Sequence, residues 1–345
     1  MRPFPDPNAV RKILLIKPSS LGDIIHALPV LNMLHARFPE AEIHWVVAKG
    51  FHGMLEDHPL IHKLWIIDKN SWKNPRKCAG TFSELRALRS DLKREQFDLV
   101  IDLQGLLRSA VIGLFTGTED RVGFADAREG AKYTYSHRVP ASWDEHAVER
   151  NVRIALALGC GMDDFSFPFP PLDLRQDLAE RLPSRFAVIA PSAGTLVKRW
   201  PAENFGKLAS GLFLPSVVVG GASDCMLADE IVEKSNGRAF SLAGRISLRE
   251  LAAVISRARF LVSPDTGPMH IAAALNVPVF ALFGPTNPGR TGPYGKIHTV
   301  IRNKMECSPC YSRRPCQDWR CMTGITPEKV LEIINGSDCA AADPR

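Results

Sequence analysis

Short apolar runs and amphipathic segments alternate along the first half of the chain. The apolar runs are typical of buried strands and cover residues 12–16, 42–48, 63–68 and 97–105. Segments with apolar residues every three or four positions are typical of helices and cover residues 24–38, 81–95, 106–115 and 143–158. Pro29 falls early in the first of these, where a missing N–H is tolerated. This alternation predicts an α/β domain with helices on both faces of a parallel sheet.

The second half repeats this pattern after an interruption. Its apolar runs cover residues 186–191, 216–222, 260–265 and 277–284, and its helical segments cover residues 201–213, 226–236, 247–258 and 267–276. Ser247 and Glu250 have the spacing of a capping box at the start of one helix. Residues 159–173 are rich in proline and glycine and show no periodicity, so a linker is expected there. The sequence therefore predicts two Rossmann-like domains, residues 1–165 and 166–345.

Length and composition narrow the class of protein. A chain of 345 residues exceeds what one hydrophobic core usually serves. No apolar run approaches the length of a membrane span, and the N-terminus lacks an apolar signal core, so a cytoplasmic protein is expected. The net charge of +6 is not gathered in a basic block, which disfavours nucleic acid as a partner. An anionic substrate or an acidic membrane surface fits this charge equally well.

Four of the eight cysteines gather in one segment, residues 307–321. They are Cys307, Cys310, Cys316 and Cys321. This set could hold a structural zinc ion, form disulfides or remain reduced. The other four, Cys78, Cys160, Cys225 and Cys339, are scattered and expected to be inert. No His, Asp and Glu cluster has the spacing of a catalytic metal site, so no required cofactor is expected.

Polar residues that follow the predicted strands are the candidates for chemistry, because doubly wound sheets bind ligands beyond the carboxyl ends of their strands. The first such stretch is "KPSSLGD", residues 17–23, which has neither the dinucleotide glycine pattern nor a Walker lysine. Ser20 or Asp23 in this stretch could simply cap the helix that follows. Alternatively, Asp23 is a general base.

Two further strand ends carry basic and small residues. In "PSAGTLVKRWP", residues 191–201, Lys198 is suited to neutralising a phosphate, although a solvated Lys198–Arg199 pair beside a packed Trp200 would give the same pattern. Gly220 and Gly221 end another strand, and they mark either an ordinary turn or room for a flat base.

A fourth stretch, residues 265–270, joins a buried strand to a helix start. The first N–H groups of a helix attract phosphate, Thr266 adds a hydroxyl donor, and Gly267 permits close approach of the backbone. Asp265 would repel a phosphate, so it is expected to accept hydrogen bonds from neighbouring N–H groups or a sugar hydroxyl. His270 lies one turn into the helix and is either structural or part of the same site.

Five motifs taken together resemble the ADP-heptose:lipopolysaccharide heptosyltransferases. They are "KPSSLGDIIHALPVL", "DLQGLLRS", "HAVERN", "VKRWP" and "SPDTGPMHIAAALNVPVFALFGPTNPGRTGPYG". The resemblance extends from about Lys12 to Val330. It implies the two-domain GT-B architecture, with an acceptor-binding first domain and a nucleotide-sugar-binding second domain whose parallel sheets face a central cleft. It also implies an inverting, metal-independent transfer from ADP-L-glycero-D-manno-heptose to the inner core of lipopolysaccharide.

The resemblance also implies roles for individual residues. Asp23 matches the general base. Lys198, Asp265, Thr266, Gly267 and His270 match donor-binding residues. Ser192, Gly220 and Gly221, at neighbouring strand ends, are further donor-binding candidates. The acceptor-binding residues would be Lys17, Ser20, Gly22, Gln104 and Arg108, with Arg128 and Arg150 as further candidates for Kdo carboxylates or lipid A phosphates.

The resemblance leaves the acceptor open. The N-terminal motifs resemble the group that adds the first heptose to Kdo-lipid A, whereas "KRWP" and "ITPEKVL" resemble the group that extends a heptosylated core. Either acceptor would place the protein at the inner face of the cytoplasmic membrane. Two rival functions remain: a nucleotide-sugar epimerase of the same architecture, and a sensor that binds the donor without chemistry.

Overall fold

A computed structural model describes residues 4–68, 78–314 and 316–341. The start of the first expected domain, residues 1–3, and the end of the second, residues 342–345, lie outside the described residues. The chain divides into two compact units, Met1–Pro171 and Leu172–Arg345. This division lies within the expected linker, later in the chain than the expected boundary at residue 165. Each unit is considered by itself below.

Unit 1 is built on a six-stranded sheet in the order β3-β2-β1-β4-β5-β6, with every neighbouring pair parallel. The strands are β1 (Lys12–Ile16), β2 (Glu42–Ala48), β3 (Lys63–Ile67), β4 (Leu99–Asp102), β5 (Arg121–Phe124) and β6 (His137–Val139). The apolar runs predicted as buried strands correspond to β1 to β4. The strands β5 and β6 had no clear signal in the sequence because they are short and interrupted by glycine or charged residues.

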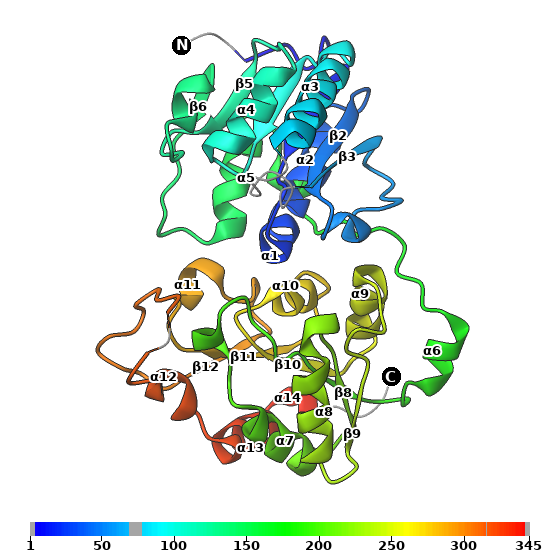
Figure 1. Ribbon diagram of the computed structural model, residues 1–345, viewed down its shortest axis with the longest axis vertical. Coiled ribbons are helices and arrows are strands. Elements are labelled where there is room, and N and C mark those ends of the chain that lie inside the picture. Colours follow the sequence, from blue (N-terminus) through cyan, green and yellow to red (C-terminus); the bar gives the residue numbers. More distant parts are fainter. Residues whose placement is uncertain (1–3, 69–77, 315, 342–345) are drawn as a thin grey trace. The chain divides into compact units, whose positions relative to one another are not determined.

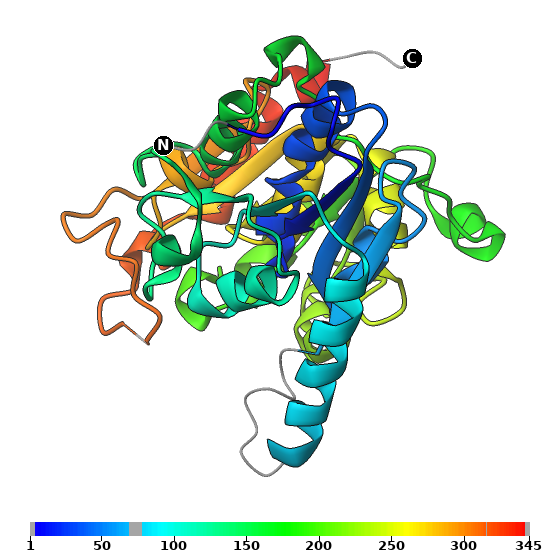
Figure 2. The same cartoon turned by 90° about the horizontal axis from the view of Figure 1, so that it is seen from above.

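The helices of unit 1 connect these parallel strands (Figure 1). They are α1 (Leu21–Ile25), α2 (Leu28–Arg37), α3 (Cys78–Arg94), α4 (Leu107–Phe115) and α5 (Ala147–Ala157), with short 3-10 helices such as η1 (His52–Met54), η4 (Ala131–Thr134) and η5 (Met162–Asp164). The helix expected over residues 24–38 is divided, and Pro29 lies in the first turn of α2, where proline is tolerated. The long helix α3 extends outward beyond the sheet (Figure 2).

Unit 2 repeats the topology with the order β12-β11-β10-β7-β8-β9, again with parallel neighbours. Its strands are β7 (Ala187–Ile189), β8 (Ser216–Val218), β9 (Ala239–Ser241), β10 (Phe260–Pro264), β11 (Val279–Phe283) and β12 (Thr299–Arg302). Its helices include α6 (Gln176–Arg181), α7 (Ala202–Gly211), α8 (Cys225–Glu233), α9 (Leu248–Ser256), α10 (Gly267–Ala274), α11 (Pro288–Thr291), α12 (Arg320–Thr323), α13 (Pro327–Asn335) and α14 (Asp338–Ala341).

Apolar burial explains why each sheet holds together. In unit 1 the side chains of Leu14, Ile16 and Val46 are fully buried, and in unit 2 the buried rings of Trp200 and Phe205 pack edge to face.

The capping box predicted at α9 is confirmed, because the Ser247 hydroxyl accepts from the Glu250 N–H at 3.2 Å and the Glu250 carboxylate accepts from the Ser247 N–H at 2.8 Å. In the described part of the chain, no helix is both long and apolar enough to cross a bilayer.

Candidate functional site

Both sheets reverse their strand order at one point, and the candidate residues lie next to those two points. In unit 1 the order reverses between β1 and β4, and in unit 2 between β7 and β10. Doubly wound sheets bind ligands at this position, beyond the carboxyl ends of the strands. Lys17 and Asp23 follow β1, and Gln104 follows β4. Lys198 follows β7, and Asp265 follows β10.

Unit 1 has a pocket of about 160 Å³ at its reversal point. Its polar and aromatic lining residues are Lys17, Asp23, Gln104, Phe124, Arg128, Trp143, Arg150 and Asn151. The carbonyl oxygen of the Gln104 side chain is buried and has no hydrogen-bond partner among the described residues. A ligand hydroxyl could donate to this oxygen. Of the predicted acceptor residues, the structure therefore brings Lys17 and Gln104, together with the further candidates Arg128 and Arg150, into one pocket with Asp23.

Asp23 both caps a helix and lines this pocket. Its Oδ2 accepts hydrogen bonds from the Ser20 N–H at 2.8 Å and the Ser20 hydroxyl at 2.7 Å. The roles of helix cap and general base are therefore compatible for Asp23. These bonds fix the carboxylate in the first turn of α1, and the residue is half-buried and lines the pocket. Ser20 itself is exposed and holds Asp23, and Gly22 is buried inside α1; neither residue lines the pocket.

The Lys17 side chain is held in place by the turn that follows β4. Its ammonium group is buried and donates to the Leu103 carbonyl oxygen at 2.7 Å. Burial lowers the pKa of Lys17, and the neighbouring carboxylates of Asp23 and Asp102 act in the opposite direction. This ammonium therefore connects the loop after β1 to the turn after β4 and offsets the negative charge of Asp23.

One wall of the pocket is basic and aromatic. Arg150 is ion-paired with Asp126 and lies 4.2 Å from the centre of the Trp143 ring. Arg128 lies 5.2 Å from the same ring, is exposed, and forms no ion pair within the described residues. Arg128 is thus the pocket cation best placed to take an anionic ligand. Arg108 is exposed on α4 and does not line the pocket.

In unit 2 an ion pair joins the two loops at the reversal point. The Lys198 Nζ lies 2.7 Å from the Asp265 Oδ2, and the His270 Nε2 lies 3.8 Å from the Asp265 Oδ1. Asp265 and His270 are buried, whereas about a quarter of the Lys198 side chain is exposed. The carboxylate expected to accept from backbone or sugar hydroxyls therefore also fixes the ammonium that was expected to bind phosphate.

The helix after Asp265 presents free N–H groups beside this pair. Thr266 is the N-cap of the eight-residue helix α10, and its side chain makes no capping hydrogen bond. Gly267 and Pro268 open the helix. The helix dipole and the uncapped first turn favour an anion here, and the Thr266 hydroxyl remains able to donate to it.

Asp224 is a site residue that the sequence reading missed. Its carboxylate accepts from the Ser192 hydroxyl at 2.8 Å and the Gly221 N–H at 2.9 Å, and lies 3.9 Å from the Arg199 guanidinium. A Cβ atom on Gly220 would lie 2.8 Å from the Asp224 Cβ, so glycine is required there. Asp224 thus joins the loops after β7 and β8. Its position three residues after a glycine pair was the available signal.

Comparison with known proteins identifies the family. The sequence matches glycosyltransferase family 9 (heptosyltransferase) over residues 85–318. This chain belongs to glycosyltransferase family 9. Lipopolysaccharide heptosyltransferase 1 of Pseudomonas aeruginosa is 32% identical over 346 residues, covering 92% of this chain and 96% of that protein. The resemblance stated from the sequence motifs is therefore confirmed, and the protein is a glycosyltransferase.

Solved structures confirm the GT-B fold class. The structure of E. coli ADP-heptose lps heptosyltransferase II has a TM-score of 0.75 and 25% identity, covering 94% of this chain and 97% of that one. The structure of E. coli heptosyltransferase WaaC with ADP-2-deoxy-2-fluoro heptose has a TM-score of 0.73 and 26% identity, covering 94% and 99%. Both matches extend over the two units of this family 9 chain.

The four clustered cysteines of this family 9 chain form no disulfide in the structure. Cys307, Cys310 and Cys316 are exposed, and Cys321 is buried. Within the described residues, they do not form a group of three or more ligand atoms that all lie within 4.8 Å of one another. The Cys78 side chain lies outside the described part of the chain, and the remaining cysteines are free thiols.

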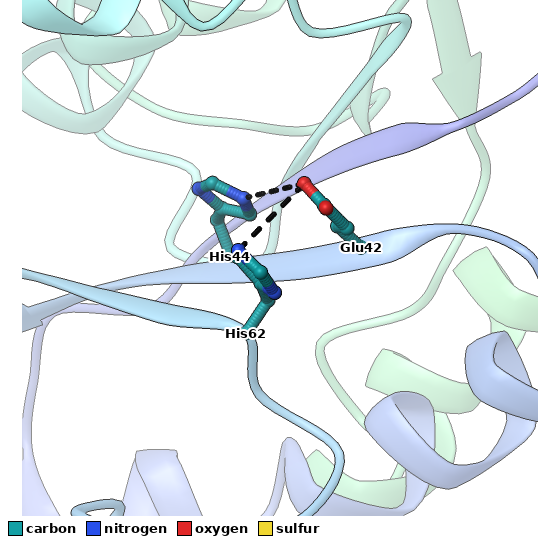
Figure 3. A group of neighbouring side chains, drawn as sticks. All are labelled: Glu42, His44 and His62. Atoms are coloured by element: carbon teal, nitrogen blue, oxygen red, sulfur yellow. Dashed lines mark ion pairs between the residues drawn. The ribbon is translucent and has the colours of Figure 1, made fainter.

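Glu42, His44 and His62 do form such a group, at the amino ends of β2 and β3 (Figure 3). The Glu42 Oε2 lies 3.7 Å from the His44 Nε2 and 3.8 Å from the His62 Nε2. However, the Trp65 indole N–H donates to the His44 Nδ1 at 3.1 Å, so the neutral ring carries its proton on Nε2, where a metal would bind. A metal-bound histidine normally donates through its other nitrogen. The bond from Trp65 therefore disfavours a metal ion at this group.

Burial of this group makes stability depend on pH. Burial lowers the pKa of His44 to about 4 from its ordinary value of 6.5. Between these two values the unfolded chain binds more protons, so the contribution of His44 is full above pH 6.5 and is lost as the pH falls toward about 4. The loss is at most about 3 kcal/mol.

His44→Gln is expected to flatten this dependence, since glutamine keeps an acceptor for Trp65 and does not titrate. Urea unfolding followed by tryptophan fluorescence, at pH about 7 and about 4.5, measures the difference. The lowered pKa values of His58 and His298 act in the same direction, so part of the dependence should persist. If the free energy of unfolding of His44→Gln fell as steeply between these two pH values as that of the wild type, His44 would not be the source of the pH dependence.

Proposed function

We propose that this glycosyltransferase moves L-glycero-D-manno-heptose from ADP-heptose to a Kdo residue of the lipopolysaccharide inner core, with inversion at the anomeric carbon. The observation that carries the proposal is the carboxylate of Asp23, fixed by Ser20 in a pocket that also holds Lys17 and Arg128. Such a pocket suits an anionic sugar whose hydroxyl must lose a proton. The names of the relatives supply the sugar and the nucleotide.

The reaction needs one base and one stabilised leaving group. Asp23 takes the proton of the acceptor hydroxyl, and that oxygen forms a bond to the anomeric carbon from the face opposite the nucleotide. The bond between the anomeric carbon and the diphosphate oxygen breaks, and its electron pair leaves with ADP. The charge that develops on the diphosphate then requires fixed hydrogen-bond donors or cations.

Unit 2 has the groups to meet this charge. The Lys198 ammonium, held by Asp265, and the first N–H groups of α10 would bind the diphosphate. Ser192, Gly220 and Gly221, ordered by Asp224, would form the nucleotide side of the same site. His270 would orient Asp265 or contact the sugar.

The acceptor is proposed to bind in unit 1. Arg128 would pair with the Kdo carboxylate, because a guanidinium matches a planar carboxylate with two parallel hydrogen bonds. The buried carbonyl oxygen of Gln104 would accept from a sugar hydroxyl. Because such an acceptor carries lipid chains, the protein would work at the inner face of the cytoplasmic membrane.

Purified protein, ADP-heptose and two acceptors test the proposal. Kdo2-lipid A is expected to gain one heptose, detected by mass spectrometry, while the same lipid already carrying one heptose should react much more slowly. The 31% identity to lipopolysaccharide heptosyltransferase 1 of E. coli, against 27% to lipopolysaccharide heptosyltransferase 2 of the same organism, favours Kdo2-lipid A as the acceptor. Faster reaction of the heptosylated lipid would assign the second transfer. Isomerisation of ADP-heptose without acceptor would support the epimerase instead. Tight binding of ADP-heptose without turnover would support the sensor.

A further inference from the structure

The buried carboxylate of Asp102, at the end of β4, connects the pocket of unit 1 to Tyr135, which is far from it in the sequence. Only 2% of Asp102 is exposed. Its Oδ2 accepts a hydrogen bond from the Tyr135 hydroxyl at 2.7 Å, and its Oδ1 accepts from the N–H groups of Gln104 at 2.8 Å and Gly105 at 3.1 Å. One carboxylate therefore holds the turn after β4 on one side and Tyr135 on the other.

The backbone of β5 makes room for this contact. Gly123 lies beside Asp102 in the register of β4 and β5. A Cβ atom on Gly123 would lie 2.4 Å from the Tyr135 ring. The absence of a side chain on Gly123 thus lets the ring cross the strand and its hydroxyl reach Asp102. Arg121 holds the tyrosine segment in place through hydrogen bonds to Thr134 and Ser136.

The turn that Asp102 holds is part of the pocket. Leu103, Gln104 and Gly105 all line it, and the Leu103 carbonyl oxygen accepts from the Lys17 ammonium. Lys17 and Asp23 line the same pocket. A shift of this turn would therefore move Gln104 and release the partner of the cation beside Asp23.

The carboxylate depends on these hydrogen bonds because no ion pair holds it among the described residues. Burial raises the pKa of Asp102, and hydrogen bonds, first that from Tyr135 and then those from Gly105, Ser109 and Gln104, lower it. The charged groups around it are the Lys17 ammonium, which interacts electrostatically with Asp102, and Asp23 and Arg150, which interact with the same ammonium. Removing the Tyr135 hydroxyl would favour protonation of Asp102, which weakens its ability to accept from the turn.

We propose that Tyr135 is a positioning residue for the acceptor pocket: through Asp102 it holds the turn that carries Gln104 and the carbonyl partner of Lys17. Tyr135 touches no substrate in this arrangement. The effect on catalysis rests on the proposed function, whereas the hold on the turn does not.

Tyr135→Phe tests the proposal, because the ring stays over Gly123 and only the hydroxyl is lost. The KM for Kdo2-lipid A is expected to rise about tenfold while the affinity for ADP stays unchanged. The defect should grow as the pH is lowered, since Asp102 takes up its proton at a higher pH in the variant than in the wild type. Tyr133→Phe, two residues away on η4 with an exposed ring, is the matched control and should behave like the wild type.

Hydrogen–deuterium exchange tests the same inference without activity. The amides of Gln104 and Gly105 should exchange about tenfold faster in Tyr135→Phe than in wild type or Tyr133→Phe at the same pH. Asp102→Asn removes the titrating group, so the pH dependence of the defect should disappear in it. Unchanged exchange at both amides, or equal changes of donor and acceptor KM, would overturn the proposal. An inactive wild type with faster exchange in the variant would instead reject only the proposed function.

Discussion

Asp23→Asn is expected to lower kcat for heptose transfer by about 10²–10⁴-fold, with ADP affinity unchanged. Asparagine keeps a side-chain oxygen that can accept from Ser20, so the start of α1 should persist. What is lost is the basicity of the carboxylate, because an amide oxygen accepts hydrogen bonds but does not take up the acceptor proton. Single-turnover kinetics with ADP-heptose and Kdo2-lipid A measure the chemical step, and calorimetry with ADP measures binding.

Two controls separate catalysis from folding in this experiment. Asp163→Asn changes an exposed carboxylate on η5 and should leave kcat unchanged. Ser20→Ala removes one of the two hydrogen bonds to Asp23 and should lower kcat only moderately. Turnover within a few-fold of wild type in Asp23→Asn would remove this residue from the role of base.

Lys198→Met is expected to weaken ADP binding and to lower kcat/KM by about 10²–10³-fold, the cost of losing one preorganised donor to the charge of the leaving group. Methionine has a similar length, so packing around the loop after β7 should be retained. The loss also leaves the buried Asp265 carboxylate without its closest cation, which adds a repulsion toward the diphosphate.

The second variant of this pair distinguishes those two effects. Asp265→Asn keeps the ammonium and removes the charge that fixes it, so ADP binding should fall less than in Lys198→Met. Lys207→Met is the surface control, since Lys207 pairs with Glu203 on the exposed side of α7. Calorimetry of ADP with the three variants gives the comparison, and wild-type affinity in Lys198→Met would contradict the proposed diphosphate contact.

The candidate site was partly visible in the sequence, because polar residues at strand ends need no tertiary information to be recognised. Lys17, Asp23, Lys198 and Asp265 were found in this way. Arg108 was named as an acceptor residue through the family resemblance, yet it is exposed and does not line the pocket. Whether Arg108 faces the pocket depends on its position around the axis of α4, and the sequence of one helical turn does not determine which side of the helix faces the pocket. Asp224 was missed because a carboxylate inside a glycine turn resembles ordinary turn chemistry.

Sequence alone determined the alternation of strands and helices, the repeat of this pattern in two halves, and the family. Those features are local: apolar periodicity records which faces are buried, and motifs keep their order along the chain. Only the tertiary structure decided that Lys198 pairs with Asp265, that Tyr135 reaches Asp102 over Gly123, and that Trp65 directs the proton of His44. Such contacts depend on which strands become neighbours, and periodicity carries no record of that choice.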